Sequence, residues 1–112
     1  MDSMQVGNTI RDQIAAGRAY DGTTGWQAMM CWGADRLTGA AASDQDMGWL
    51  SFSVKGRKFK GHVKVRLMFN DTYTVEFKKR RKYELITVKS HENVYCDELT
   101  RLIDEYVESG AK

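Results

Sequence analysis

The alternation of apolar and polar residues between Trp49 and Lys89 constrains the fold of this chain more than any other feature. A period of two residues is typical of strands that bury one face and expose the other. The alternating apolar positions are Leu50, Phe52 and Val54, then Val63, Val65, Leu67 and Phe69, then Tyr73, Val75 and Phe77. The sequence therefore predicts an antiparallel meander over residues 49–89, in which consecutive strands are joined by hairpin turns.

The segments between these strands have the composition of turns. Gly56 can adopt positive φ, and the pair Asn70–Asp71 tolerates left-handed backbone. The third connection, Lys78–Lys82, leads into a fourth strand over Tyr83–Lys89, and residues 90–93 are expected to form a loop. The alternation changes parity inside the fourth strand, so either both of its faces are covered or a β-bulge resets the register.

An amphipathic helix is predicted near the C-terminal end, over residues 96–109. Its apolar residues recur at the spacing i, i+3, i+4, i+7 and i+8, which forms one stripe along a helix. These residues are Leu99, Leu102, Ile103, Tyr106 and Val107. The stripe needs an apolar surface, and we expect it to pack on the odd-numbered face of the meander. At about 25 cal/mol per Å² of apolar area, this burial is the main stabilising term available.

The first part of the chain, residues 8–37, is predicted to be helical. One short helix begins at Asn8 or Thr9 and ends at Gly17, with Ile10 and Ile14 on its inner face. A second helix extends to about Leu37. It begins at the capping-box spacing Thr24-Gly-Trp-Gln27.

The helical pattern is less regular in two segments, residues 29–32 inside the helical region and residues 39–47 after it. Residues 29–32 could form a short buried strand instead of helix, because Gly33 weakens the helical pattern. Residues 39–47 are small and polar, and are predicted to connect the helical region to the sheet. The expected fold is thus α+β in a single domain over residues 1–112, with N-terminal helical segments, a four-stranded meander and a C-terminal helix on one sheet face.

Composition agrees with a globular domain. The chain has 112 residues, of which 42% are apolar and 29% are charged, and these are ordinary globular values. No apolar run approaches the ~18 residues that cross a bilayer, so we expect no membrane association and a cytoplasmic location. Cys31 and Cys96 have no Cys or His at metal-ligand spacing, and we expect reduced, partly buried thiols.

Positive charge is concentrated in the predicted sheet. Residues 49–89 hold twelve basic and three acidic side chains, whereas the flanking segments are both acidic overall. The first and third turns of a meander lie at the same end, so the cations of both turns are expected to converge there. The candidate partner-binding or nucleic-acid-binding residues are Trp49, Lys55, Arg57, Lys58, Lys60, Lys64, Arg66, Lys78, Lys79, Arg80, Arg81 and Lys82.

Three interpretations of this basic surface stay open. It could bind nucleic acid, with phosphates on the cations and bases stacked on Trp49 or Trp32. It could contact an acidic protein surface, or it could be a solvated sheet edge whose lysines prevent aggregation. Catalysis is not expected, because neither His62 nor His91 lies at a sequence spacing typical of a nucleophile with its orienting acid or of a pair of metal ligands. We therefore predict a non-enzymatic protein without metal or cofactor.

Several segments resemble a group of small phage and prophage accessory proteins. The resemblance spans Ile10 to Ile103, and its most specific parts are Val75-Glu-Phe77 and Val94-Tyr-Cys-Asp97-Glu-Leu99. It implies a phage-type inhibitor of the anti-CRISPR kind, which would act in the host cytoplasm on a host defence protein or nucleoprotein complex. The alternative is a general single-strand or duplex nucleic-acid-binding protein of phage DNA metabolism. Uncovered sheet edges also make a homodimer plausible.

Overall fold

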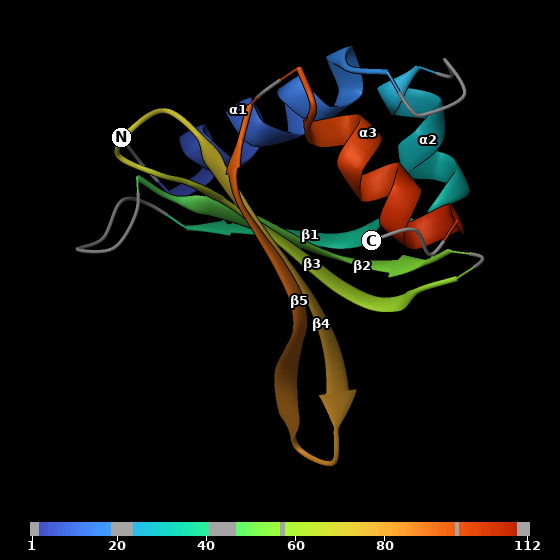
Figure 1. Ribbon diagram of the computed structural model, residues 1–112. Coiled ribbons are helices and arrows are strands. Elements are labelled where there is room, and N and C mark those ends of the chain that lie inside the picture. The colour runs from blue at the N-terminus through green and yellow to red at the C-terminus, as the bar shows by residue number, and fades with distance from the viewer. Residues whose placement is uncertain (1–2, 19–23, 41–46, 57, 96, 110–112) are drawn as a thin grey trace.

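The computed structural model describes residues 3–18, 24–40, 47–56, 58–95 and 97–109. A five-stranded antiparallel sheet in the order β1-β2-β3-β4-β5 carries the helices on one of its faces (Figure 1). The strands are β1 Asp35–Ala40, β2 Trp49–Lys55, β3 Lys60–Leu67, β4 Tyr73–Arg81 and β5 Glu84–Val94. The helices are α1 Ser3–Ala16, α2 Gly25–Cys31 and α3 Leu99–Asp104, continued by the π-helical turn η1 Glu105–Ser109. The α+β class and the meander are confirmed, but the sheet has five strands rather than four.

The additional strand, β1, lies where the sequence predicted the end of a helix and a connector. The helix ends earlier because Gly33 adopts φ +64. Its N–H donates to the carbonyl of Met30, and the N–H of Ala34 donates to the carbonyl of Met29, both at 3.1 Å. These two bonds form a Schellman motif, which ends an α-helix and redirects the chain. Residues 29–31 are helical, so the strand alternative for this segment is wrong.

Replacement of Gly33 by alanine is expected to destabilise the protein by about 1–2 kcal/mol, the cost of left-handed backbone for an L-residue. An added Cβ would lie 3.7 Å from the nearest atom, the Cβ of Lys55, so steric overlap does not contribute. Urea denaturation of Gly33→Ala and Gly33→Asn measures the effect. Asparagine tolerates this conformation better and should lose less; equal losses would contradict a backbone origin.

Helix α1 is longer than predicted. It begins at Ser3, so Asn8 and Thr9 lie inside the helix rather than at its cap. Its inner face is as expected, because Ile10 and Ile14 are fully buried. This helix packs against β1, β2 and α2, and it therefore covers part of the sheet that the sequence assigned to the C-terminal helix.

The predicted inner face of the meander, even-numbered in β2 and odd-numbered in β3 and β4, forms the core with one exception. Val63, Val65, Val75 and Phe77 are fully buried as predicted. Phe69 is 61% exposed, because β3 ends at Leu67 and the alternation does not continue through the turn. Phe59, for which the alternation predicts no role, is buried at 4% exposure.

The C-terminal helix buries its predicted stripe but begins at Leu99 rather than at residue 96. Leu99, Ile103 and Val107 are fully buried. In η1 the Tyr106 ring stacks on the ring of Phe77, with centroids 3.9 Å apart and an interplanar angle of 26°. This helix therefore meets the sheet at β4. None of the described helices is long and apolar enough to cross a membrane.

Strand β5 is the second large departure from the prediction. It continues to Val94, so residues 90–93 are strand rather than loop. Phe77 faces Lys89 across the ladder, whereas Lys78 faces Thr87, which leaves Val88 as an extra residue. This is a β-bulge of the kind that the change of parity allowed. Leu85 and Ile86 lie before it, opposite Arg80 and Lys79, and therefore still face opposite sides of the ribbon.

Candidate functional site

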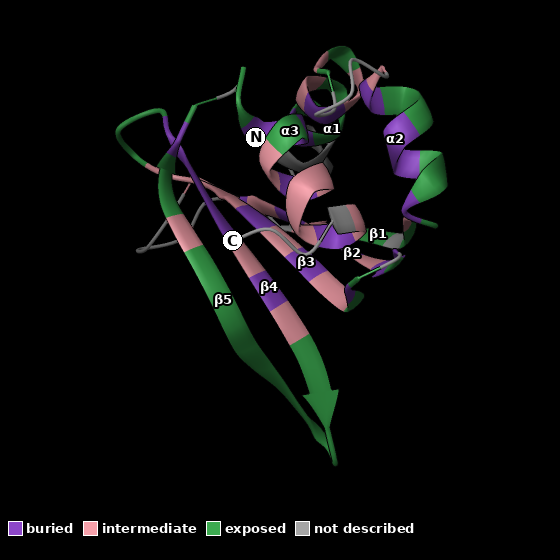
Figure 2. Ribbon diagram, turned by 45° about the vertical axis from the view of Figure 1, so that its right-hand side comes forward, coloured by how far each residue is buried: buried purple, intermediate pink, exposed green. Residues whose placement is uncertain are grey.

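The β4–β5 hairpin extends beyond the rest of the sheet. Strand β3 pairs with β4 only as far as Lys78, opposite His62, so the residues of β4 beyond it pair only with β5 in the described sheet. Every residue from Lys79 to Ser90 is exposed, and we call this segment the arm (Figure 2). The arm is closed by Lys82–Tyr83, and φ of +54 at Lys82 suits the mirror-image turns of tight hairpins. The arm is thus a two-stranded ribbon without a hydrophobic core.

The arm and its first neighbour, Lys78, hold most of the unbalanced positive charge. Residues 78–89 contain six basic side chains and one acidic side chain, Glu84. Among the residues that the structure describes, none of the four cations from Lys79 to Lys82 forms an ion pair. Cations that lie this close repel one another, and an anionic partner would remove the repulsion.

The cations of the arm divide between its two faces. Side chains alternate along a strand, so Lys79 and Arg81 face the helical side, like Phe77, while Lys78 and Arg80 face the opposite side. The Nζ atom of Lys79 accordingly lies 5.7 Å from the centroid of the Phe59 ring. On the other side, the Nζ atom of Lys78 lies 3.7 Å from Oε1 of Glu76. The arm therefore presents positive charge in two opposite directions.

The uncovered outer face of the sheet is less strongly charged than the sequence suggested. Nη1 of Arg66 lies 3.7 Å from Oε2 of Glu76, which thus pairs with Lys78 and Arg66 together. The Nζ atom of Lys64 lies 4.5 Å from the centroid of the half-buried Trp49 ring, a cation–π contact. Because Lys64 already covers one face of this ring, Trp49 is a poorer stacking platform for bases than an open indole.

The cations of the β2–β3 turn do not all converge with those of the arm. Lys55 and Lys60 are cross-strand partners at the end of β2 and β3, and Arg57 lies outside the described residues. The tip of the arm, with Lys82, extends away from this turn in Figures 1 and 2. Lys58, however, lines one pocket with Lys79 and Arg81. The two turns share an end of the sheet, but the length of the arm separates most of their charges.

Other candidate residues have structural roles. The Trp32 side chain is fully buried, donates from Nε1 to Oδ1 of Asp104 at 2.9 Å and stacks on Phe52, so it is not a stacking platform. Cys31 is exposed rather than partly buried, and Cys96 lies outside the described residues. Within the described part of the chain, no group of three or more His, Cys, Asp or Glu side chains is arranged to hold a metal ion.

Sequence reasoning did not identify the aromatic residues that lie beside the cations. Phe59 contacts the rings of Phe77 and Tyr106, with centroids 5.6 and 5.1 Å away. The available signal was Phe59 itself, an apolar residue of core parity between Lys58 and Lys60. Tyr106 was predicted only as part of the helical stripe.

Comparison of the chain with protein-family models, with curated proteins and with solved structures gives no match.

Proposed function

We propose that the protein binds nucleic acid through the arm. The observation that carries this proposal is a two-stranded ribbon that is exposed along its whole length and holds four consecutive cations without described ion pairs. An isolated hairpin is at best marginally stable in water, so such a ribbon contributes little to the core of the domain. Its composition instead favours contact with a polyanion.

The dimensions and charge of the arm suit a groove of duplex DNA. The major groove of B-DNA admits a two-stranded β-ribbon. A groove has a phosphate backbone on each side, and the arm has cations on each of its faces, with Lys79 and Arg81 on one and Arg80 on the other. Lys82 and Tyr83 form the tip, and the Tyr83 side chain is 97% exposed. We infer that the cations supply phosphate contacts and that Tyr83 contacts bases.

The binding of a fluorescent random duplex tests this function. Each phosphate contact contributes about −0.9 to the slope of log affinity against log salt concentration. With about five contacts, affinity should fall roughly 100- to 1,000-fold between 50 and 200 mM salt. Fluorescence anisotropy over this range measures the slope, and a single strand of the same sequence serves for comparison. Unchanged anisotropy at low salt, at micromolar protein, would overturn the proposal.

A second candidate follows from the apolar residues of the arm. Besides Tyr83, the side chains of Leu85, Ile86 and Val88 are exposed, and such residues are typical of protein interfaces. Under this proposal the protein is a non-enzymatic, phage-type antagonist that binds a host defence nucleoprotein through the arm. It would show little affinity for free nucleic acid, and Ile86→Asp would abolish complex formation more completely than Arg80→Ser. The reverse order of effects would favour nucleic acid as the partner.

The expected homodimer stays a prediction. Strands β1 and β5 are the two edges of the described sheet, and an edge strand is where a second chain can pair with a sheet. Sedimentation velocity at several protein concentrations measures the oligomeric state directly.

A further inference from the structure

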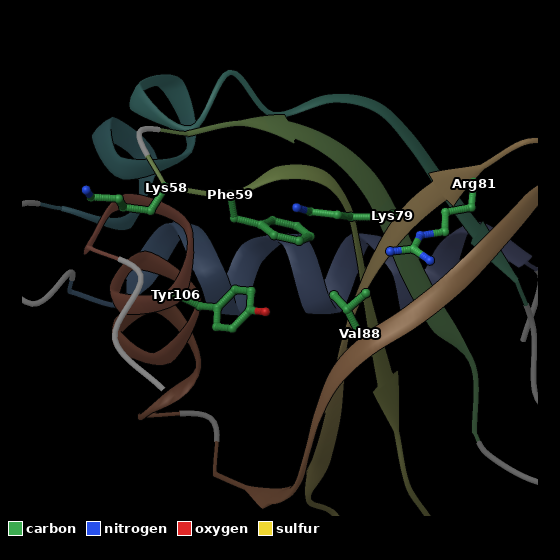
Figure 3. Close-up of a pocket in the computed structure, with 6 residues that line it drawn as sticks. All are labelled: Lys58, Phe59, Lys79, Arg81, Val88 and Tyr106. Atoms are coloured by element: carbon green, nitrogen blue, oxygen red, sulfur yellow. The ribbon is translucent and has the colours of Figure 1, made fainter.

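A pocket lies at the base of the arm, on the side of the sheet that carries the helices (Figure 3). Its volume is about 310 Å³, at the lower end of the range for small-molecule sites. The β2–β3 turn, both strands of the arm and the C-terminal helix all contribute to it. The lining residues are Lys58, Phe59, Lys79, Arg81, Val88 and Tyr106.

The polar groups of the pocket are donors. Figure 3 shows the guanidinium group of Arg81 directed into the space between Lys79 and Val88, and the hydroxyl of Tyr106 directed toward Val88 from the opposite side. Lys58 lies at the margin, with its ammonium group pointing outward. Neither Lys79 nor Arg81 pairs with a carboxylate among the described residues. The interior thus has positive charge and a hydroxyl, without a paired anion.

The apolar groups of the pocket form its walls. Phe59 is held in place by its contacts with Phe77 and Tyr106, and Val88 lines the same space from β5. A ligand that fits this pocket therefore has a compact anionic group joined to a less polar part. A phosphate group on a sugar has this combination.

We propose that this pocket binds the phosphate group of a single nucleotide, either at the end of a nucleic-acid strand or free in solution. The planar guanidinium group of Arg81 can donate two parallel hydrogen bonds to phosphate oxygens, and Lys79 adds a second charge. Tyr106 donates its hydroxyl proton to a further oxygen, while Phe59 and Val88 face the sugar. As a strand-end site, this assignment rests on the proposed nucleic-acid function; as a mononucleotide site, it does not.

Calorimetric titrations with four probes test the pocket. The probes are inorganic phosphate, dTMP, and one oligonucleotide prepared with and without a 5′-phosphate. We expect dTMP to bind more tightly than inorganic phosphate, and a 5′-phosphate to strengthen oligonucleotide binding at least five-fold if the pocket takes strand ends. Binding of dTMP without any effect of the 5′-phosphate would assign the pocket to free nucleotides. Absence of dTMP binding together with no effect of the 5′-phosphate would overturn the proposal.

Matched variants separate the pocket from the general charge of the arm. Arg81→Ser should weaken dTMP binding at least ten-fold, whereas Arg80→Ser, on the opposite face, should change it less than two-fold. Tyr106→Phe keeps the ring that stacks on Phe77 and removes only the hydroxyl, so a three- to ten-fold loss is expected without unfolding. Equal losses for Arg80→Ser and Arg81→Ser would reduce the pocket to non-specific attraction and overturn its assignment.

The same measurements distinguish failure of the pocket from failure of the proposed function. Binding of random duplex with no response to dTMP or to the 5′-phosphate would leave the arm as a nucleic-acid interface and remove the pocket. Binding of dTMP without binding of any oligonucleotide would leave the pocket as a nucleotide site and remove the arm as a nucleic-acid interface.

Discussion

Simultaneous reversal of three charges on the arm, Lys79→Glu, Arg80→Glu and Arg81→Glu, is expected to reduce affinity for random duplex about 1,000-fold at 50 mM salt. Loss of three phosphate contacts removes about three units from the salt slope, and the counterion release of each contact is worth more than ten-fold in affinity at this salt concentration. Residues 78–89 would then carry three basic and four acidic side chains in place of six and one. Fluorescence anisotropy at several salt concentrations measures both the affinity and the slope.

This variant should keep its fold, because all three residues are exposed and make no described ion pair. Substitutions on such surfaces usually change stability by no more than about 0.5 kcal/mol each. The double variant Arg11→Glu and Arg18→Glu, on exposed residues outside the sheet, changes the net charge by about −4, against about −6 for the arm variant, and controls for the general effect of lost positive charge. If the control loses as much affinity as the arm variant, or if the arm variant binds like the wild type, the arm is not the interface.

The regular part of the sheet could be predicted because burial imposes a period. In β2, β3 and β4, alternate apolar residues enter the core, so the alternation in the sequence predicted correctly that residues such as Val65 and Val75 lie on the same face. Strand β1 gave no such signal. It lies at an edge, Leu37 and Thr38 are both exposed, and pairing with β2 and packing against α1 place it in the sheet without an alternation of buried side chains.

The candidate site was predictable in its charge but not in its shape. The five consecutive cations Lys78–Lys82 indicate a basic surface in any fold. These cations lie on two faces only because β4 continues as a strand past the end of β3. A strand that is exposed on both sides has no alternation of apolar and polar residues, so the sequence does not indicate where it ends. The pocket also depends on Phe59 turning into the core and on η1 bringing Tyr106 over Phe77, two contacts between distant parts of the chain.

Replacement of Phe77 by alanine is expected to destabilise the protein by about 3–5 kcal/mol, the usual cost of a deleted core aromatic side chain. Its ring is fully buried, stacks on Tyr106 and contacts Phe59 and His91 edge-on. Since a domain of this size is stabilised by only about 5–15 kcal/mol, this loss is a large fraction of the total. Urea denaturation followed by circular dichroism measures it.

Phe69 provides the matched control, because the alternation of the sequence assigned both phenylalanines to the same face. Its ring is 61% exposed beyond the end of β3, so Phe69→Ala should change stability by about 0.5 kcal/mol or less. Similar losses for the two variants would mean that Phe69 packs in the core, as the sequence pattern alone predicts. A large loss confined to Phe77→Ala would instead place the end of the buried sheet at Leu67 and make Phe77 the residue that joins the base of the arm to the C-terminal helix.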